Sequence, residues 1–434
     1  HNENERRKSV LCKRKRPPPT NAFPEKAVIF SCFLNNVKGL ALSDIRSANV
    51  HRRLQRSLCP LQSELSASRP LHHSFSYIRA VMLSDILAAR VAQAYASNEY
   101  PVLLNQFEVW KNTRPLAGLR ILDATPVFEN TLAKHAVLLA AGAELTVGID
   151  DVMPRNNEVV RYLRSVGIPV VEPKEVKTSR AFDLVLDCAA AFAELKPRIG
   201  FVELTRSGVS KYADKSCPVY VADSGRIKRI ETCLGTGESY FRAMAQLGYS
   251  QWQGKSIVIF GSGKVGSGLI TYAHRYGCRI TVVTRPGDIT DRIRVLCDAV
   301  IDASDGIAIA EAVSQANAVV TATGVPSAAT AACPADVFIR SKALLANMGV
   351  EDEFGAGVPA GRVLEAKRPL NFILKDPTLM KYIDATMALH NEGAVVLASK
   401  KMPAGLIEPD ASTEERLLSI CREKGTISDE LNYI

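Results

Sequence analysis

The sequence predicts an α/β fold with two parallel sheets, each doubly wound with helices. Short β-branched and apolar runs alternate with segments of helical periodicity from residue 118 to residue 399, as in successive βαβ units. One strand-to-helix turn also carries glycines at the spacing G-x-G-x-x-G. Because no run of 18 or more apolar residues occurs, the sequence predicts no transmembrane helix.

The first sheet is expected within residues 82–235. Ser84 is predicted to cap a helix that ends near residue 96. Its strand patterns lie at residues 118–124, 144–148, 169–171 and 182–186, and helical patterns lie at 128–141 and 158–166. The first strand-to-helix turn, Ala124-Thr125-Pro126, contains no glycine. We therefore expect a Rossmann-like domain that binds a substrate instead of a dinucleotide.

The glycine turn lies between two buried strand patterns, at residues 256–260 and 279–283, with a helical pattern over 267–276. Gly261 permits a tight turn, Gly263 lets the backbone approach a pyrophosphate, and Gly266 lets the helix pack against the strand. The helix N-terminus adds free N–H groups and the positive end of its dipole. The alternative is a glycine-rich turn without a ligand. We predict a dinucleotide site formed by Gly261, Ser262, Gly263, Lys264, Val265 and Gly266.

The end of the second strand bears on the choice between NAD and NADP. An NAD site usually has an acid there for the ribose 2′-hydroxyl, whereas this chain has Thr284 and Arg285, with Asp288 three residues further on. Arginine can hold a 2′-phosphate in a bidentate manner. The pair favours NADP, unless Arg285 is only a solvated loop residue.

The second sheet and its connections complete the expected organisation. Further strand patterns lie at residues 299–301, 318–322, 344–347 and 371–374, with a helix at 307–315. A helix over 231–247 would connect the sheets, and helices over 378–390 and 392–399 would return to the first domain. We expect a tail at 1–81, a substrate domain at 82–235, a dinucleotide-binding domain at 236–375, and return helices with a C-terminal tail at 376–434.

The first 79 residues are basic and show little periodicity. They hold 15 Lys and Arg against 5 Asp and Glu, with basic runs at residues 6–8 and 13–16. Such a segment is typical of a nuclear signal, a nucleic-acid-binding arm or an organelle transit peptide. The alternative that we adopt is a disordered tail, or upstream sequence ahead of a start near Met82.

The remaining residues hold 39 Lys and Arg against 40 Asp and Glu, so the formal net charge of +9 arises in the first segment. We therefore expect no nucleic-acid partner for the globular part. The ten cysteines form no CxxC pair and no ligand-like cluster. This pattern predicts reduced thiols, no metal site and a cytoplasmic location. The expected partner is a small-molecule substrate, without membrane association.

Five local motifs, in this order along the chain, resemble those of the S-adenosylhomocysteine hydrolase family. They are ELTRSGV at 203–209, VADS with GES at 221–239, GSGKVGSG at 261–268, TATG at 321–324 and NMG at 347–349. The resemblance covers about residues 116–397. It implies two Rossmann-like domains, a bound NAD and a homo-oligomer, either a dimer or a tetramer. It also assigns cofactor contacts to Thr205, Arg206, Ser207, Thr321, Ala322, Thr323, Gly324 and Asn347.

The chain departs from this family at most positions that carry the family's chemistry. The resemblance implies oxidation of the substrate's 3′-hydroxyl by bound NAD, elimination of homocysteine, addition of water and reduction back. Aligned without gaps, the family's functional residues fall on Cys188, Ile227, Glu231, Thr232, Thr236, Val350 and Asp376. Each lost acid, base or oxyanion donor removes several kcal/mol of transition-state stabilisation. We therefore expect altered hydrolase chemistry.

Four residues remain as catalytic candidates. A hydride transfer at an alcohol carbon needs a general acid or base nearby, and Lys228 is the candidate, with Glu231 as its charged partner after a one-residue shift of the alignment. Glu203 is the candidate anchor for a substrate hydroxyl, and Asp376 is the fourth candidate. The alternatives are an exposed lysine on the connecting helix and, for Asp376, a cap on the helix near Thr378.

The histidines are expected to have structural roles. His135 and His274 lie in helical patterns and suit packing or the surface, and His390 suits a cation at a helix C-terminus.

Three functional hypotheses follow. The first is an NAD(P)-binding enzyme of the adenosylhomocysteinase type that transfers a hydride to or from a nucleoside-like or other small hydroxylated substrate. The second is a non-catalytic dinucleotide-binding sensor or partner subunit. The third is an authentic adenosylhomocysteinase with a rearranged active site, which must release homocysteine from the adenosyl thioether.

Overall fold

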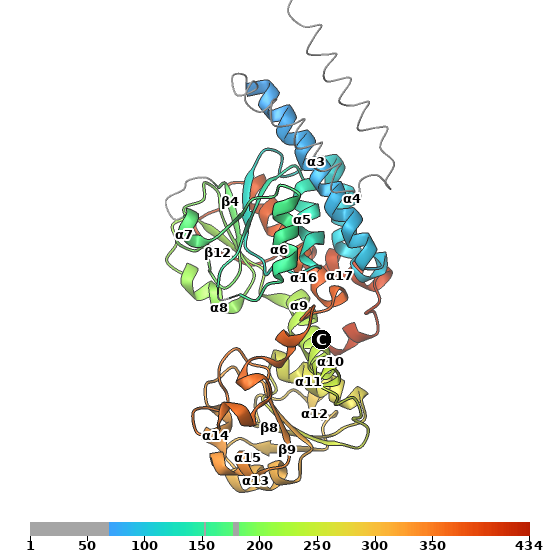
Figure 1. The fold of residues 1–434 in the computed structure, drawn as a ribbon, viewed down its shortest axis with the longest axis vertical. Helices are drawn as coiled ribbons and strands as arrows, with labels where there is room; N and C mark the ends of the chain where they lie inside the picture. Colours follow the sequence, from blue (N-terminus) through green and yellow to red (C-terminus); the bar gives the residue numbers. More distant parts are fainter. Residues whose placement is uncertain (1–68, 152, 177–181) are drawn as a thin grey trace, which may run out of the picture. The chain divides into compact units, whose positions relative to one another are not determined.

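The computed structural model describes residues 69–151, 153–176 and 182–434 (Figure 1). The basic segment at residues 1–79, to which the interpretations of the N-terminal sequence refer, lies almost entirely outside the described residues. Of the described residues, none belongs to a helix long and apolar enough to cross a membrane.

One sheet has seven parallel strands in the order β12-β6-β5-β4-β1-β2-β3. The strands are β1 (Arg120–Asp123), β2 (Glu144–Gly148), β3 (Val170–Val171), β4 (Leu184–Asp187), β5 (Gly200–Glu203), β6 (Pro218–Val221) and β12 (Gly405–Ile407). The central strands β4 and β5 are buried along their whole length. This burial is typical of a parallel sheet covered on both faces.

The other sheet has five parallel strands in the order β11-β10-β7-β8-β9. The strands are β7 (Ser256–Phe260), β8 (Arg279–Thr284), β9 (Ala299–Asp302), β10 (Ala318–Thr321) and β11 (Leu344–Asn347). The two sheets confirm the predicted α/β fold class. In each sheet the strand order reverses once, between β1 and β4 and between β7 and β10, and ligands of such folds bind beyond the carboxyl ends of the strands at that reversal.

The helices accompany the strands in chain order. The α-helices are α3 (Arg69–Ala94), α4 (Pro101–Thr113), α5 (Thr131–Ala140), α6 (Asn157–Ser165), α7 (Pro173–Val176), α8 (Arg206–Val209), α9 (Gly225–Arg229), α10 (Thr236–Gln246), α11 (Lys264–Arg275), α12 (Asp291–Arg294), α13 (Gly306–Gln315), α14 (Ala328–Ala332), α15 (Ala335–Arg340), α16 (Met380–Ser399) and α17 (Ala411–Lys424). A π-helical segment, η5 (Ile230–Gly235), joins α9 to α10. The 3₁₀ turns are η3 (Ser97–Glu99), η4 (Ser210–Tyr212), η6 (Ala360–Arg362), η7 (Leu364–Lys367), η8 (Leu370–Ile373) and η9 (Glu430–Tyr433).

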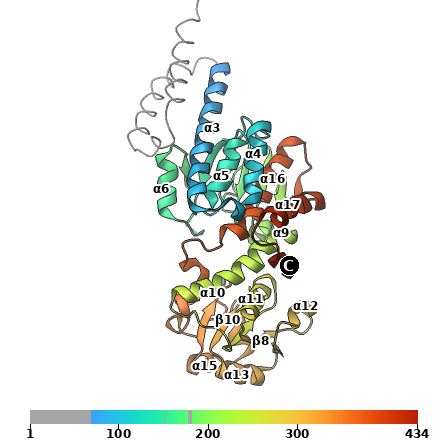
Figure 2. The same cartoon turned by 90° about the vertical axis from the view of Figure 1, so that its right-hand side faces the viewer.

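Two glycines let the connecting helix pack closely on α11. A Cβ at Gly268 would overlap the carbonyl oxygen of Cys233 in η5, and a Cβ at Gly237 would overlap the backbone of Gly268. Figure 2 shows α10 and α11 side by side. The backbones of η5, α10 and α11 therefore meet without intervening side chains.

Helix α16 is buried over most of its length and packs against β4, β5 and β6. Both carboxylate oxygens of Asp384 accept hydrogen bonds from the first turn of α4, from the N–H groups of Val102 and Leu103 at 2.9 Å each. Tyr382 bonds to Tyr272 of α11 and to Glu430 of η9. The helix thus joins segments that are far apart in the sequence.

Four expectations about elements were wrong. Ser84 does not cap a helix but lies inside α3, where its hydroxyl donates to the carbonyl of Val81. Residues 371–374 form the 3₁₀ turn η8 and not a strand. The two expected return helices are the single helix α16, and its last residue lies nine positions beyond His390. His390 is therefore not a cation at a helix C-terminus.

Candidate functional site

Four acidic residues mark the carboxyl edge of the seven-stranded sheet. Asp123, Asp187 and Glu203 are the last residues of β1, β4 and β5, and Asp223 follows β6 by two positions. All four are buried. Since β6, β5, β4 and β1 are neighbours in the sheet, the four carboxyl groups lie in a row along its edge.

Asp123 is the centre of a buried polar cluster. Its carboxylate accepts hydrogen bonds from Lys134 Nζ at 2.6 Å and Thr125 Oγ1 at 2.7 Å, and His135 Nε2 lies at 3.3 Å. Burial alone would raise the pKa of Asp123, but Lys134 and His135 hold this pKa well below its usual range. Asp123 is therefore a counter-ion in the core and not a group that exchanges protons near neutral pH.

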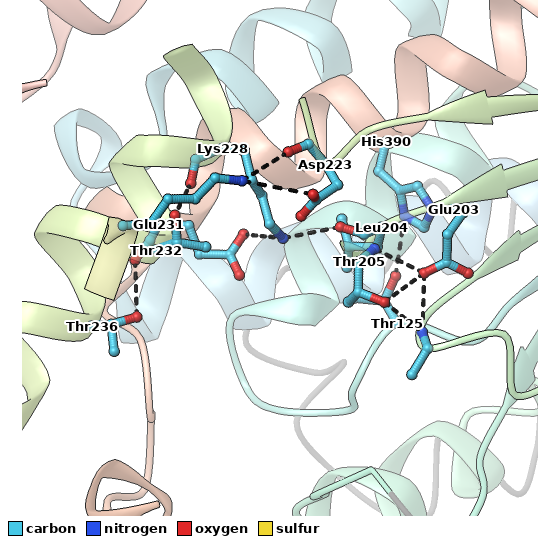
Figure 3. Close-up of polar contacts among 12 residues, drawn as sticks. Thr125, Glu203, Leu204, Thr205, Asp223, Lys228, Glu231, Thr232, Thr236 and His390 are labelled. Atoms are coloured by element: carbon cyan, nitrogen blue, oxygen red, sulfur yellow. Dashed lines mark hydrogen bonds and ion pairs between the residues drawn. The ribbon is translucent and has the colours of Figure 1, made fainter. Parts of the chain in front are cut away.

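His390 of α16 extends this cluster to β5. Its Nδ1 lies 3.4 Å from Thr125 Oγ1 and its Nε2 lies 2.9 Å from the carbonyl oxygen of Val202 (Figure 3). Burial, together with the charge of Lys134, lowers the pKa of His390 to about 3. The imidazole is therefore neutral at physiological pH.

Glu203 is held by groups of its own domain. Oε1 accepts from Thr205 N at 2.8 Å and from Thr205 Oγ1 at 2.7 Å (Figure 3). Oε1 also accepts from Ala189 N at 3.0 Å, and Oε2 accepts from Ala190 N at 3.1 Å. Ala189 and Ala190 have φ values of 55° and 56°, a conformation that is unfavourable for alanine. The carboxylate stabilises this strained turn, and burial raises its pKa.

Asp187 lies beside Glu203 in the neighbouring strand. It accepts hydrogen bonds from Tyr212 Oη at 2.5 Å, Cys188 N at 2.8 Å and Phe192 N at 2.9 Å. Burial, with the nearby charge of Glu203, raises the pKa of Asp187 to about 7. Cys188 is buried, and burial raises the pKa of its thiol.

Lys228 and Glu231 form an ion pair with each other. Lys228 Nζ donates to Glu231 Oε2 at 3.0 Å and to the carbonyl of Leu204 at 3.0 Å (Figure 3). Burial alone would lower the pKa of Lys228, but the charges of Glu231 and Asp223 raise it above its usual value. Lys228 is 3% exposed, so it is not a solvated lysine on a helix surface.

Asp376 lies apart from the other catalytic candidates. Its Oδ2 accepts from Tyr95 Oη at 3.1 Å, and its carbonyl accepts from Arg242 Nη1 at 2.9 Å. Among the described residues, no hydrogen bond or ion pair joins it to Lys228, Glu203 or Glu231. It also does not cap α16, whose N-cap, Leu379, receives no side-chain hydrogen bond.

The glycine turn has the shape that a dinucleotide requires. Gly261 has a φ of 98°, and a Cβ there would lie 2.6 Å from the carbonyl oxygen of Ala322. A Cβ at Gly266 would overlap the carbonyl oxygen of Gly261. A Cβ at Gly263 would meet no atom within 4 Å, so open space lies over this residue. These residues fit a bound pyrophosphate, because the first N–H groups of α11 would donate hydrogen bonds to its oxygens.

The neighbours of the glycine turn connect it to both sheets. Ser262 Oγ lies 2.9 Å from Thr284 Oγ1, so the buried Thr284 supports the turn. Val265 packs against the core, and Lys264 is exposed, with Nζ 3.7 Å from Asp223 Oδ2. The Lys264–Asp223 contact brings the glycine turn to the acidic edge of the seven-stranded sheet.

Arg285 is exposed and forms an ion pair with Asp288, with Nε 2.8 Å from Oδ2. Exposed pairs of this kind are weak. Arg285 can therefore exchange Asp288 for another anion.

The remaining cofactor candidates surround the ends of β5, β10 and β11. Thr205 is the N-cap of α8, and Arg206 and Ser207 are exposed in its first turn. Thr321 Oγ1 donates to Asn347 Oδ1 at 3.0 Å, and Asn347 Nδ2 donates to three backbone carbonyls of its own loop region. Thr321 and Asn347 are thus fully buried, and Asn347 holds the chain that follows β11.

The turn after β10 depends on a residue that sequence reasoning missed. Both carboxylate oxygens of Glu353 accept from Thr323 N, at 3.0 and 2.8 Å, and Oε1 accepts from Gly324 N at 2.8 Å. Thr323 Oγ1 donates to Oε2 at 2.7 Å. Asp223 and the Asp123–Lys134 pair were also missed. An acid at the end of a strand, or two positions beyond it, was the available signal for Asp123 and Asp223.

A small hollow, with room for about one water molecule, lies at the strand-order reversal of the seven-stranded sheet. It is lined by residues 124–127, 148–150, 153–155 and 191–192. Thr125 links this hollow to His390, and Glu203 fixes the turn that leads to Ala191 and Phe192. Among the described residues, no group of three or more His, Cys, Asp or Glu side chains could hold a metal ion.

Sequence comparisons find distant relatives of this chain. No protein-family model matches it. It is 24% identical over 262 residues to the adenosylhomocysteinase of Aeropyrum pernix, covering 54% of this chain and 62% of that protein. It is 24% identical over 257 residues to the S-inosyl-L-homocysteine hydrolase of Methanopyrus kandleri, covering 53% of this chain and 59% of that protein. The aligned part spans about three fifths of each relative's length.

Solved structures show only limited likeness. A dipicolinate synthase from Bacillus halodurans has a TM-score of 0.39 and 14% identity, covering 66% of this chain and 99% of its own. The transhydrogenase from Sinorhizobium meliloti has a TM-score of 0.38 and 12% identity, covering 67% of this chain and 99% of its own.

Proposed function

We propose that this protein is a nicotinamide-dinucleotide-dependent enzyme that transfers a hydride to or from an oxygen-bearing carbon of a small, nucleoside-like substrate. The observation that carries the proposal is the contact between Lys264 and Asp223, because it joins the glycine turn to the edge that holds the buried Lys228–Glu231 pair. Similarity to adenosylhomocysteinases over about half of the chain supports this class of chemistry.

The glycine turn would hold the dinucleotide. The N–H groups at the start of α11 and the ammonium of Lys264 suit the pyrophosphate, and the turn at residues 322–324 suits the nicotinamide end of the molecule, which carries no phosphate. When bound, the nicotinamide supplies hydride transfer.

Either NAD or NADP is compatible with this site. The Arg285–Asp288 pair is exposed, so Arg285 can leave Asp288 for a 2′-phosphate, while Asp288 can accept a hydrogen bond from a ribose 2′-hydroxyl. Titration with both dinucleotides decides between them.

Lys228 would supply the proton in this reaction. Its pKa is raised by Glu231 and Asp223, so Nζ carries a proton and can donate it to an oxygen that becomes an alcohol. Glu231 holds the ammonium in place at 3.0 Å. This charge state favours reduction of a carbonyl over oxidation of an alcohol.

The small hollow at the β1–β4 reversal would border the bound substrate. Its walls include Thr125 and Phe192, and its position agrees with the general location of ligands in doubly wound sheets. Glu203 would act by fixing the turn beside this hollow, since four hydrogen bonds already engage its carboxylate. This role replaces the predicted one of a substrate-hydroxyl anchor.

The test combines binding with turnover. The full chain is titrated with oxidised and reduced NAD and NADP by calorimetry, then mixed with adenosine or S-adenosylhomocysteine while nicotinamide absorbance is recorded. We expect Lys228→Met to lower turnover by about 10²- to 10⁴-fold, the usual contribution of a general acid, with dinucleotide affinity nearly unchanged.

A matched pair of glycine variants controls for the site. Gly263→Val fills the open space over the turn and is expected to abolish dinucleotide binding, whereas Gly361→Ala lies in η6, also with no atom near its added Cβ, and should bind normally. Absence of dinucleotide binding in the wild type would overturn the proposal.

A second function is supported by the same contacts. Lys228 donates hydrogen bonds to Leu204 and Glu231, and the carboxylate of Glu203 accepts hydrogen bonds from its own domain. Such contacts are also expected of residues with structural roles in a non-catalytic protein. That protein would bind dinucleotide as a sensor or as a partner of an enzyme. Such a sensor binds dinucleotide without turnover, and Lys228→Met leaves its binding unchanged. Release of homocysteine from S-adenosylhomocysteine would instead identify a rearranged hydrolase.

A further inference from the structure

The turn after β10 has its backbone donors occupied from within the protein. The carboxylate of Glu353 accepts hydrogen bonds from the N–H groups of Thr323 and Gly324 and from the hydroxyl of Thr323. All these partners are donors, which an ionised carboxylate accepts. Glu353 is 0% exposed, and a Cβ at Gly349 would overlap its Oε1. The residues around Glu353 are therefore fitted to a carboxylate at this place.

The turn lies directly across from the glycine turn. A Cβ at Gly261 would lie 2.6 Å from the carbonyl oxygen of Ala322 and 3.2 Å from the Cα of Thr323. Backbone bonds from Ser327 N to Asp352 O and from Ala329 N to Glu353 O also fasten the chain after β10 to the loop after β11. Glu353 thus braces one wall of the reversal point between β7 and β10.

Consecutive backbone N–H groups in a turn form a concave anion site. At the β10 turn this site is filled by Glu353, just as the strained turn at Ala189 and Ala190 is filled by Glu203. A phosphate cannot use donors that a buried carboxylate already occupies. The pyrophosphate is therefore directed to the glycine turn, and the end of the dinucleotide without phosphate is directed to the β10 turn.

Within the described part of the chain, the charge of Glu353 has no cationic partner nearby. Among the ion pairs of these residues none includes Glu353, whereas the adjacent Asp352 is paired with Lys367 at 2.8 Å. A negative charge behind the β10 turn attracts a cationic ligand in front of it. Oxidised nicotinamide carries a positive charge on its ring, and reduced nicotinamide does not.

We propose that Glu353 is a positioning residue that orients the dinucleotide and makes the site bind its oxidised form more tightly than its reduced form. This inference rests on the proposed dinucleotide site, because it concerns the same ligand. The buried carboxylate of Glu353 would thus both hold the β10 turn in its conformation and favour binding of the oxidised nicotinamide ring.

The test measures three dissociation constants for each protein by calorimetry. The ligands are ADP-ribose, which lacks the nicotinamide, and the oxidised and reduced dinucleotide. The variants are Glu353→Gln and the control Asp352→Asn, a neighbouring acid that bonds to Phe354 N and Gly355 N instead of the β10 turn. Loss of one charge at an assumed separation of about 10 Å and an effective dielectric constant of about 20–40 changes affinity by roughly four- to sixteenfold.

For Glu353→Gln we expect the preference for the oxidised form to fall by about four- to sixteenfold, with ADP-ribose affinity within about twofold of the wild type. Asp352→Asn should retain the preference. An unchanged preference in Glu353→Gln, or equal weakening of all three ligands, overturns the inference.

Two further outcomes separate this inference from the proposed function. A wild type that binds ADP-ribose and prefers reduced dinucleotide overturns the inference while the proposed site stands. A wild type that binds none of the three ligands overturns both. The wild-type preference also decides the matter if Glu353→Gln does not fold.

Discussion

Glu203 shows how a residue that suits catalysis can be committed to structure. Its carboxylate is buried and receives four hydrogen bonds, two of which come from the strained residues Ala189 and Ala190. Each left-handed alanine costs roughly 1–2 kcal/mol. The turn therefore depends on a carboxylate at this position.

We expect Glu203→Gln to destabilise the protein by about 1–3 kcal/mol, because the new amide group turns a donor towards the N–H group of Ala190 or Ala189. Chemical denaturation monitored by circular dichroism measures this loss. Glu194→Gln, an exposed acid of the same loop, should change the free energy of unfolding by less than about 0.5 kcal/mol. Equal stabilities of the two variants would show that Glu203 does not hold the turn.

At the residue scale, the sequence predicted which residue types gather at the edge but not how each is used. Lys228 was found only by allowing a one-residue shift, since a gapless alignment places Ile227 at the lysine position and already places Glu231 at a functional one. Glu353 was missed because its role depends on a turn 29 residues away in the chain.

At the scale of elements, strands with strong β-branched patterns were predicted well, as in β2, β7 and β8. The short strands β5, β6 and β12 have three or four residues each, and β6 begins with a proline. Their pairing in the sheet defines them more than their own pattern. Residues 371–374 are equally apolar, yet Pro369 and Pro377 flank a 3₁₀ turn there.

The contact of α11 with the connecting helix gives an element-scale prediction. We expect Gly268→Ala to destabilise the protein by about 1–3 kcal/mol, because the methyl group overlaps the carbonyl oxygen of Cys233 and separates the two backbones. Thermal denaturation measures the change. Gly361→Ala, with open space around its added Cβ, should be neutral or slightly stabilising. Wild-type stability in Gly268→Ala would mean that the helices can move apart freely.

At the scale of the whole molecule, buried titratable groups determine how stability depends on pH. Burial raises the pKa of Asp384 to about 7, and hydrogen bonds from Leu103 and Val102 offset this only in part. Asp187 behaves in the same direction, whereas His390 has a lowered pKa of about 3. Between about pH 4 and pH 6.5, the two aspartates and His390 therefore change the free energy of unfolding in opposite directions as the pH rises.

The sign follows from the protons bound in each state. Between about pH 4 and pH 7, folded Asp384 keeps a proton that the unfolded chain has released, so its contribution to the free energy of unfolding decreases as pH rises. His390 does the opposite, because the unfolded chain binds a proton below about pH 6.5 and the folded protein does not.

Replacing Asp384 isolates one of these contributions. We expect the wild type to lose on the order of 4 kcal/mol relative to Asp384→Asn between pH 4 and pH 7, since a pKa difference of about three units corresponds to that free energy. Urea denaturation at several pH values measures the difference, with Asp336→Asn, an exposed acid of α15, as the control. Parallel curves for wild type and Asp384→Asn would contradict the prediction, because the asparagine amide does not titrate. If the wild type loses stability relative to Asp384→Asn as the pH rises, burial of this carboxyl group between α16 and α4 reduces stability at neutral pH. The same carboxyl group nevertheless accepts hydrogen bonds from the first turn of α4.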